Sequence, residues 1–193
     1  MSQRTATVDL VADDTVRRFA TAVLFAALIG VLAQVSIPLP GGVPFSVQHF
    51  GVFFAGLVCG PLWGGFALAL YVLVGLAGLP VFSNFGAGLA YFAGPTGGFL
   101  VGFFLAAVVT GAVAHRSLEP RPLREVRPTW IAAAVFLALV PVYAVGVPWL
   151  ARVNGAPLGA TAAAMAPLAA VDLVKAAITV GLARGDRLLA LVE

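Results

Sequence analysis

Two ionisable side chains stand out because they lie in an otherwise apolar stretch near the end of the chain. Asp172 and Lys175, in AVDLVKAA, are three residues apart, so a helix would place them on one face. Charged groups within a bilayer are costly and usually serve a function. An acceptor and a cation on one face suit the binding of a small polar ligand. A self-neutralising structural pair and a proton relay are the alternatives that the spacing leaves open.

Neutral polar and aromatic residues extend this candidate site. Gln48 lies in VPFSVQHF and Asn84 in a glycine-rich segment, and an amide side chain both donates and accepts hydrogen bonds, which suits an amide or urea ligand. Helix capping or a bond between helices explains each amide equally well. Tyr91 either supplies an apolar wall for a ligand or marks the membrane interface. His49 would point away from Gln48 on a helix, so we expect at most one of them to face the site.

Motifs for catalysis, metal binding and nucleotide hydrolysis are absent from the sequence. It contains no GxxxxGK[ST], HExxH or GxSxG pattern and no cluster of carboxylates for a metal. The single cysteine, Cys59, lies in an apolar run and is expected to serve packing. We therefore expect a protein that is not an enzyme, with no catalytic residues, no metal and no cofactor. An intramembrane lipid-modifying enzyme is a rival class for which no catalytic constellation is found.

The composition indicates an integral membrane protein. Of 193 residues, 61% are hydrophobic and only 10% are charged, and the mean hydropathy is +1.04. A soluble domain is normally about one quarter charged, so this chain has too few charges to cover a soluble surface. These values exclude a soluble enzyme, a nucleic-acid-binding domain and a disordered regulator. The net charge of +3 is concentrated at the chain ends and in one connection.

Hydropathy predicts an all-α bundle of about six transmembrane helices. A helix needs about 20 apolar residues to cross the hydrocarbon core. No cleavable signal is evident, so the first segment is expected to remain as a helix. We expect residues 1–18 and 184–193 to be cytoplasmic and residues 19–183 to form one transmembrane substrate-binding domain. The expected spans are 19–37, 45–59, 62–79, 97–114, 130–150 and 162–183, of which the second is short and the fifth is interrupted by Pro141 and Pro148.

The distribution of arginines predicts that both termini are cytoplasmic. In a six-span arrangement, three regions lie on one side and carry nine basic residues, against Arg152 alone on the other. Positively charged residues accumulate on the cytoplasmic side of membrane proteins. The protein is therefore expected in the cytoplasmic membrane as a multi-pass protein. The nine residues are Arg4, Arg17, Arg18, Arg116, Arg121, Arg124, Arg127, Arg184 and Arg187.

Two further segments carry predictions of their own. The outer connection 80–95 is rich in glycine and aromatic residues and uncharged, so we expect it to lie over the bundle as a lid or re-entrant segment. In the first span, Ala22, Ala26 and Gly30 recur every four residues, which creates a flat strip for close helix contact. That strip serves either packing within the bundle or docking onto a partner membrane subunit.

Several of these stretches together resemble one known family. The second and third spans read VPFSVQHFGVFFAGLVCGPLWGGFALALYVLVGLAGLPVF, followed by GAGLAYFAGPTGGFLVGF and finally VDLVKAA. They strongly resemble the BioY family, the biotin-specific substrate-binding subunits (S components) of energy-coupling-factor (ECF) vitamin transporters. The resemblance covers residues 19–183, and its most specific part is the run 94–98 with Phe99 and Gly102.

The resemblance implies high-affinity biotin binding and uptake, with ATP hydrolysed only by partner subunits. The implied partners are a transmembrane coupling subunit (T component) and two ABC ATPases, in a lipid bilayer and without nucleic acid. Asp172 and Lys175 match the ligand-binding motif, and Gln48 and Asn84 fall where the family places polar contacts. Alternatives are a self-sufficient proton-coupled carrier that uses Asp172 as relay, or an S component for another vitamin. The resemblance also implies that Ala22 and Ala26 dock on the coupling subunit.

Overall fold

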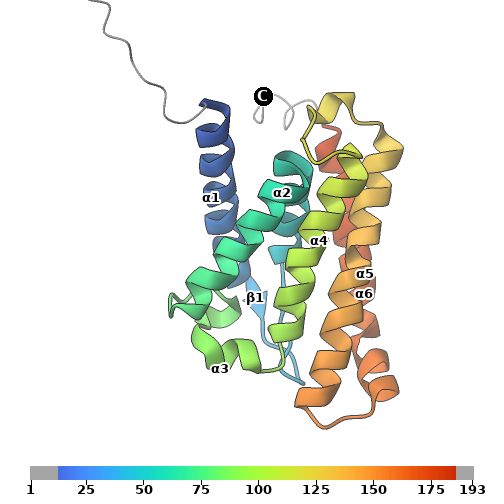
Figure 1. Ribbon diagram of the computed structural model, residues 1–193. Coiled ribbons are helices and arrows are strands. Elements are labelled where there is room, and N and C mark those ends of the chain that lie inside the picture. Colours follow the sequence, from blue (N-terminus) through green and yellow to red (C-terminus); the bar gives the residue numbers. More distant parts are fainter. Residues whose placement is uncertain (1–12, 186–193) are drawn as a thin grey trace, which may run out of the picture.

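The computed structural model describes residues 13–185 and is almost entirely helical (Figure 1). Predictions that concern residues 1–12 and 186–193, including Arg4 and Arg187, lie outside the described residues. Two strands form a short antiparallel hairpin that pairs Ser36 with Ser46 and Ile37 with Phe45. The helices and strands are α1 (Asp13–Gln34), β1 (Ser36–Ile37), β2 (Phe45–Ser46), α2 (Gln48–Leu76), α3 (Gly88–Ala93), α4 (Gly97–His115), α5 (Pro128–Val153) and α6 (Leu158–Ala183), with 3-10 turns at Ser83–Phe85 and Leu123–Glu125.

Helix α2 contains a sharp reversal, so five long helices provide six apolar segments. Five helices of the described part are long and apolar enough to cross a membrane. Within α2, Gly60 has φ 74° and ψ −177°, and Pro61 follows it. A Cβ on Gly64 would lie 2.8 Å from the Ala55 carbonyl oxygen, whereas nine residues of straight helix span about 13 Å. The two arms of α2 therefore fold back on each other, as the separate spans 45–59 and 62–79 predicted.

Helix α4 packs closely against this reversal through glycines. A Cβ on Gly56 would lie 2.5 Å from the carbonyl oxygen of Ala107, and one on Gly111 would collide with Pro61. Neither position has room for a side chain, because backbone atoms occupy the space. The reversal of α2 is thus held between its own arms and α4.

His115 satisfies a backbone group that the reversal leaves without its helical partner. Pro61 has no N–H group, so the carbonyl of Leu57 four residues earlier cannot make its usual bond. The Nε2 atom of His115 lies 2.9 Å from that carbonyl oxygen, and its Nδ1 accepts the Arg121 N–H at 3.1 Å. Since a carbonyl only accepts, these contacts assign the proton to Nε2. The Arg121 side chain also donates to the His115 carbonyl.

Replacing His115 with phenylalanine is expected to destabilise the fold. The substitution keeps a planar ring but leaves the buried Leu57 carbonyl without a donor, which costs about 1–3 kcal/mol. The measurement is the thermal unfolding temperature of the detergent-purified chain. His115→Gln, which retains an N–H donor, serves as the control. An unchanged unfolding temperature for His115→Phe would contradict this role.

The small residues of α1 lie inside the chain. Ala22 is fully buried, Ala26 is 8% exposed, and a Cβ on Gly30 would contact Val81 at 3.4 Å. The outward face of α1 instead carries larger apolar residues such as Leu24, which is 69% exposed. The predicted strip is therefore a packing surface within the bundle. Docking of this strip onto a partner membrane subunit stays a prediction.

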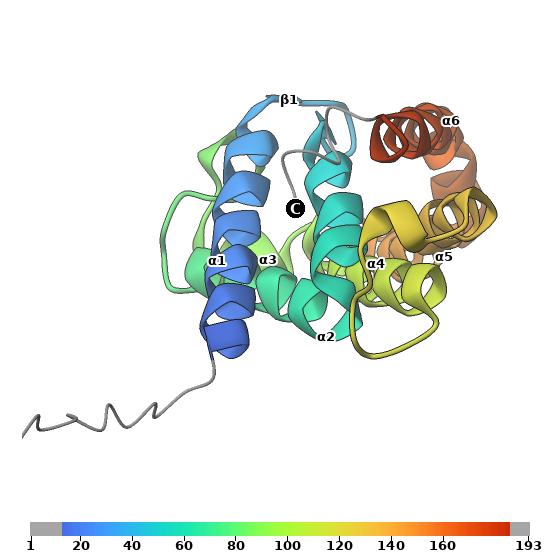
Figure 2. The ribbon, with the colours of Figure 1, turned by 90° about the horizontal axis from the view of Figure 1, so that it is seen from above.

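The connections between the helices lie at the two ends of the bundle. Figure 1 places the start of α1, the α4–α5 connection and the end of α6 at one end, and the strands, α3 and the α5–α6 connection at the other. Seen from above, α1 lies at one edge and α6 at the opposite edge (Figure 2). The described arginines of the predicted cytoplasmic regions share the first end.

Helix α5 is continuous through Pro141 and Pro148, so the predicted interruption is wrong.

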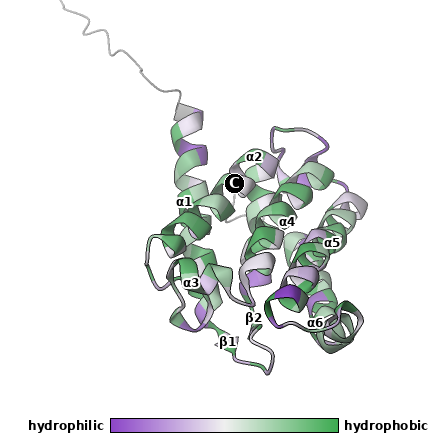
Figure 3. Cartoon of the chain, turned by 60° about the horizontal axis from the view of Figure 1, so that its bottom comes forward, coloured by the Kyte–Doolittle hydropathy of each residue, from purple (hydrophilic) through white to green (hydrophobic). Residues whose placement is uncertain are grey.

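The outward surface of the long helices is apolar. Figure 3 shows hydrophobic residues along most of their length. Among them, Leu73 is 62% exposed and Val140 is 60% exposed. Such large apolar exposure is costly in water and suits contact with lipid chains. The structure and the composition therefore both indicate a multi-pass membrane protein.

Candidate ligand-binding site

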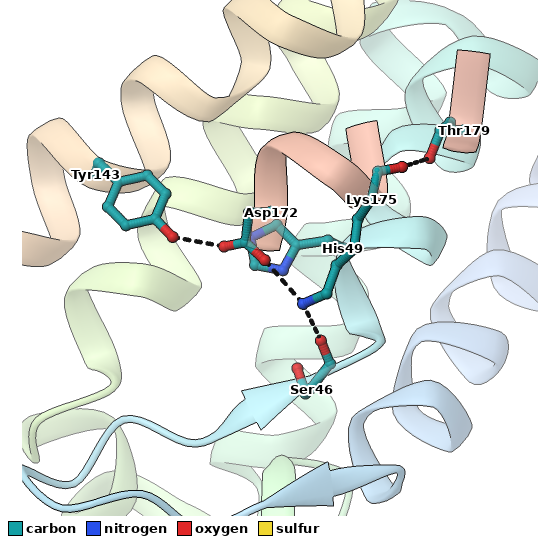
Figure 4. A network of polar contacts seen from close by, with 6 residues as sticks. All are labelled: Ser46, His49, Tyr143, Asp172, Lys175 and Thr179. Atoms are coloured by element: carbon teal, nitrogen blue, oxygen red, sulfur yellow. Dashed lines mark hydrogen bonds and ion pairs between the residues drawn. The ribbon is translucent and has the colours of Figure 1, made fainter. Parts of the chain in front are cut away.

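Asp172 and Lys175 lie on the inward face of α6 and are almost completely buried. They are 2% and 5% exposed, and their side chains form an ion pair with 2.8 Å between Asp172 Oδ1 and Lys175 Nζ. Lys175 Nζ also donates to the Ser46 carbonyl at 2.6 Å and lies 4.2 Å from the centre of the Phe45 ring. The lysine therefore connects α6 to β2 (Figure 4).

The second oxygen of Asp172 faces groups from other helices. Tyr143 of α5 donates its hydroxyl to Asp172 Oδ2 at 2.6 Å. His49 Nε2, at the start of α2, lies 3.2 Å from the same oxygen, although the pair does not satisfy hydrogen-bond geometry. Figure 4 shows the carboxylate between these side chains. Lys175 and Tyr143 thus donate hydrogen bonds to one carboxylate, and His49 lies beside it without donating one.

A small cavity lies beside this carboxylate, with a volume of about 40 Å³. Aromatic rings form much of its wall beside several polar side chains, a combination that is found in ligand pockets. The lining residues are Val43, Pro44, Ser46, Gln48, His49, Ser83, Tyr91, Thr96, Phe99, Leu100, Phe103, Tyr143, Leu168 and Asp172. A much larger groove of about 890 Å³ lies at the opposite end. The chemistry of the buried carboxylate favours the smaller cavity as the ligand site.

The structure brings most of the predicted site residues together. Asp172, Gln48 and Tyr91 line the cavity, and Lys175 lies directly behind Asp172. Asn84 is exposed and accepts a hydrogen bond from Ser36 Oγ at 3.1 Å, outside the cavity wall. A contact from Asn84 to a ligand therefore stays a prediction.

Two adjacent residues at the start of α2 carry buried polar atoms without partners. Within the described residues, Gln48 Nε2 and both ring nitrogens of His49 have no hydrogen-bond partner, and the two residues are 2% and 7% exposed. Buried polar atoms are nearly always paired, so unpaired ones at a cavity indicate a place for a ligand. Both residues line the cavity, and the prediction that only one of them would do so is wrong. The cavity wraps around the first turn of α2 and meets both side chains.

Tyr91 reaches the cavity from α3, in the connection that covers the bundle. Its ring stacks on Phe82, with 5.1 Å between the ring centres. Burial raises the pKa of the Tyr91 hydroxyl, so this group stays protonated and able to donate. Ser83 of the same connection also lines the cavity. The segment 80–95 therefore lies over the bundle as predicted, and it forms one wall of the site.

Sequence reasoning missed Tyr143 and undervalued His49. A phenol in a long apolar helix gives no signal by itself, because its partner Asp172 is 29 residues away. His49 packs edge-on against Phe103, with 4.8 Å between the ring centres, so its aromatic surroundings hide its polar role. Within residues 13–185 there is no group of three or more metal-ligating side chains.

The family model for the BioY family matches residues 2–191. The chain belongs to the BioY family. It is 44% identical over 131 residues to "Biotin transporter BioY" of Thermotoga maritima, covering 68% of this chain and 72% of that protein. It is 41% identical over 169 residues to the protein of the same name from Rhodobacter capsulatus, covering 81% of this chain and 85% of that one.

A solved structure has the same fold as this chain. The crystal structure of the S component for biotin from an ECF-type ABC transporter superposes with a TM-score of 0.80, covering 91% of this chain and 93% of that chain. The sequence identity is 24%, so this likeness concerns the fold alone. The helical bundle of this BioY family member is thus the fold of an ECF S component.

Proposed function

We propose that this chain binds biotin from outside the cell and serves as the S component of an ECF-type transporter. The observation that carries the proposal is the buried Asp172 carboxylate, held by Lys175 and Tyr143 at the edge of an aromatic cavity. Relatives named biotin transporters support the choice of ligand. The role is binding and transport rather than catalysis.

The chemistry of biotin fits the groups at the cavity. Its ureido ring has two N–H donors and one carbonyl, and Asp172 offers a carboxylate oxygen to the N–H groups. The unpaired donors of Gln48 and His49 suit the carbonyl or the carboxylate tail, and the rings of Phe99 and Phe103 suit the apolar bicycle. A site that pairs every polar group of a ligand rejects analogues that lack one.

Lys175 serves as the counter-ion of Asp172 in this proposal. Its ammonium group is already engaged by Asp172 and the Ser46 carbonyl, and it does not belong to the cavity wall. A carboxylate with a paired cation accepts hydrogen bonds more strongly than a neutral acid. The sequence left open whether the lysine meets the ligand's carboxylate, and the geometry favours the supporting role.

Binding requires the cavity to enlarge. A volume of about 40 Å³ is far below the ~300 Å³ or more that small-molecule pockets typically have. Val43 and Pro44, in the hairpin between β1 and β2, form part of the wall, and Gly41 and Gly42 beside them have positive φ. We expect this hairpin to move when biotin enters, with the 80–95 segment as the opposite wall.

Energy for uptake comes from partner subunits in this proposal. The sequence has no P-loop, so a T component and two ABC ATPases would supply ATP hydrolysis. A self-sufficient proton-coupled carrier would instead take up biotin in vesicles without an ATPase and stop when the proton gradient collapses. Uptake measured with and without the coupling module separates the two mechanisms.

Calorimetric titration of the detergent-purified full chain with biotin tests the ligand. The expected result is saturable binding of biotin, with weaker binding of dethiobiotin, which lacks the thioether ring, and none of thiamin. Thiamin binding in place of biotin would assign the chain to another vitamin. If none of the three ligands gave binding heat in the titration, the proposal would be overturned.

Replacing Tyr143 with phenylalanine is expected to weaken biotin binding by up to about tenfold, because one charge-assisted hydrogen bond that orients Asp172 is lost. The measurement is the same titration. Thr110→Val is the matched control, since the Thr110 hydroxyl is also buried but donates to the Ala106 carbonyl, outside the cavity wall. Equal affinities for wild type and Tyr143→Phe would remove the hydroxyl from the account.

The arginine-rich end is expected to face the cytoplasm. In a Cys59→Ala background, Ser117→Cys in the α4–α5 connection should react with an impermeant thiol reagent only in inverted vesicles. Asn154→Cys, at the opposite end, should react in right-side-out vesicles. The reverse pattern would invert the topology and contradict capture from outside.

A further inference from the structure

A second, wider groove lies at the end opposite the ligand site. It has a volume of about 890 Å³, within the range of about 300–1,000 Å³ that ligand sites occupy. Its walls come from the first turns of α1, the reversal of α2 and the α4–α5 connection. These elements all lie at the upper end in Figure 1.

The polar part of this groove is strongly basic. Arg17 and Arg18 contribute from α1, and Arg121 and Arg124 from the α4–α5 connection, while Asp14 is the one carboxylate in the lining. The lining thus carries a net charge of +3 by count. Guanidinium groups are planar donors that bind phosphate oxygens two at a time.

The rest of the groove is apolar and continues onto the membrane-facing surface. Leu24 and Leu28 of α1 belong to the wall and are 69% and 43% exposed. Trp63 also lines the groove, and tryptophan is enriched where a protein passes through the lipid headgroup layer. A ligand that fits both parts carries an anionic head and a hydrocarbon chain.

We propose that this groove binds one anionic phospholipid, with its phosphate on the arginines of α1 and the α4–α5 connection and an acyl chain along Leu24 and Leu28. Basic pockets between transmembrane helices on the cytoplasmic side suit anionic headgroups, and that leaflet is rich in anionic lipid. The bound lipid joins α1 to the α4–α5 connection next to the α2 reversal. This site is separate from the biotin site and independent of it.

Lipid retention measured by native mass spectrometry tests the proposal. The full chain is purified from mixed phosphatidylglycerol and phosphatidylcholine vesicles, and the bound lipids are counted. The expected result is one retained phosphatidylglycerol, preferred about fivefold over phosphatidylcholine, which corresponds to the contribution of about one arginine near a membrane surface. The double variant Arg17→Gln, Arg18→Gln should lose the preference.

The matched control is Arg127→Gln, Arg152→Gln, which removes two exposed arginines outside the groove and should keep the preference. Equal retention in both double variants, or no preference in wild type, would overturn the proposal. Loss of the lipid to added inorganic phosphate would assign the site to free phosphate instead. In the assembled transporter, a photoreactive residue in place of Leu28 should cross-link to lipid, and a cross-link to a partner subunit instead would overturn the proposal.

Discussion

Asp172→Asn is expected to raise the dissociation constant for biotin by at least tenfold. The amide is the same size as the carboxylate but carries no charge, so it offers a weaker acceptor to the ureido N–H groups. Truncating one member of a buried, hydrogen-bonded charge pair typically costs about 2–5 kcal/mol in binding. The substitution also leaves Lys175, which is 5% exposed, as a buried cation without its counter-ion.

Titration calorimetry measures this change, and Glu119→Gln is the matched control. Glu119 is an exposed carboxylate in the α4–α5 connection, so its conversion to an amide should leave the affinity unchanged. An Asp172→Asn protein that is folded and binds biotin as wild type does would remove the carboxylate from the site. Comparison with Tyr143→Phe ranks the two contributions, since the carboxylate should matter more than the hydroxyl that orients it.

Lys175→Met is expected to reduce both stability and biotin affinity. Methionine replaces the stem of the lysine but not its charge, so Asp172 remains buried without compensation, at a cost of about 3–5 kcal/mol. The chain also loses the bond from Lys175 Nζ to the Ser46 carbonyl, which fixes β2 against α6. The expected readouts are a lower unfolding temperature and a dissociation constant at least tenfold higher.

The double variant Asp172→Asn, Lys175→Met separates these two effects. It removes both charges, so the unfolding temperature should recover towards that of wild type because no buried charge is left unpaired. Biotin affinity should remain low, because the acceptor for the ureido group is gone. Recovery of affinity together with stability would mean that the pair is only structural, which was the alternative reading of AVDLVKAA.

The fold was largely predictable because membrane helices carry a strong signal. Runs of apolar residues fix the approximate extent of each segment, and Gly60-Pro61 marked the reversal within α2 that hydropathy alone would miss. The ends were less accurate. Helix α1 stops at Gln34 rather than at residue 37, since Ser36–Ile37 pairs with Phe45–Ser46. A hairpin whose strands have two residues each leaves no hydropathy signature in the sequence.

The site was predictable only where a residue was unusual in its own segment. Asp172 and Lys175 are rare charges in an apolar helix, and they prove to be buried partners. Tyr143 and His49 reach the same carboxylate from α5 and α2, and this proximity depends on how the helices pack. The small residues of α1 show the opposite problem, because the same spacing suits an internal contact and an external one, and the buried Ala22 and Ala26 show only the internal contact.

A structure of the full chain determined with biotin tests the central claim most directly. The account predicts that the ligand lies between Asp172, Gln48 and the rings of Phe99 and Phe103, with a ureido nitrogen within hydrogen-bond distance of an Asp172 oxygen. The hairpin that carries Val43 and Pro44 should be displaced from its position here. Biotin bound elsewhere, with the Asp172–Lys175 pair unchanged and no contact to it, would contradict the account.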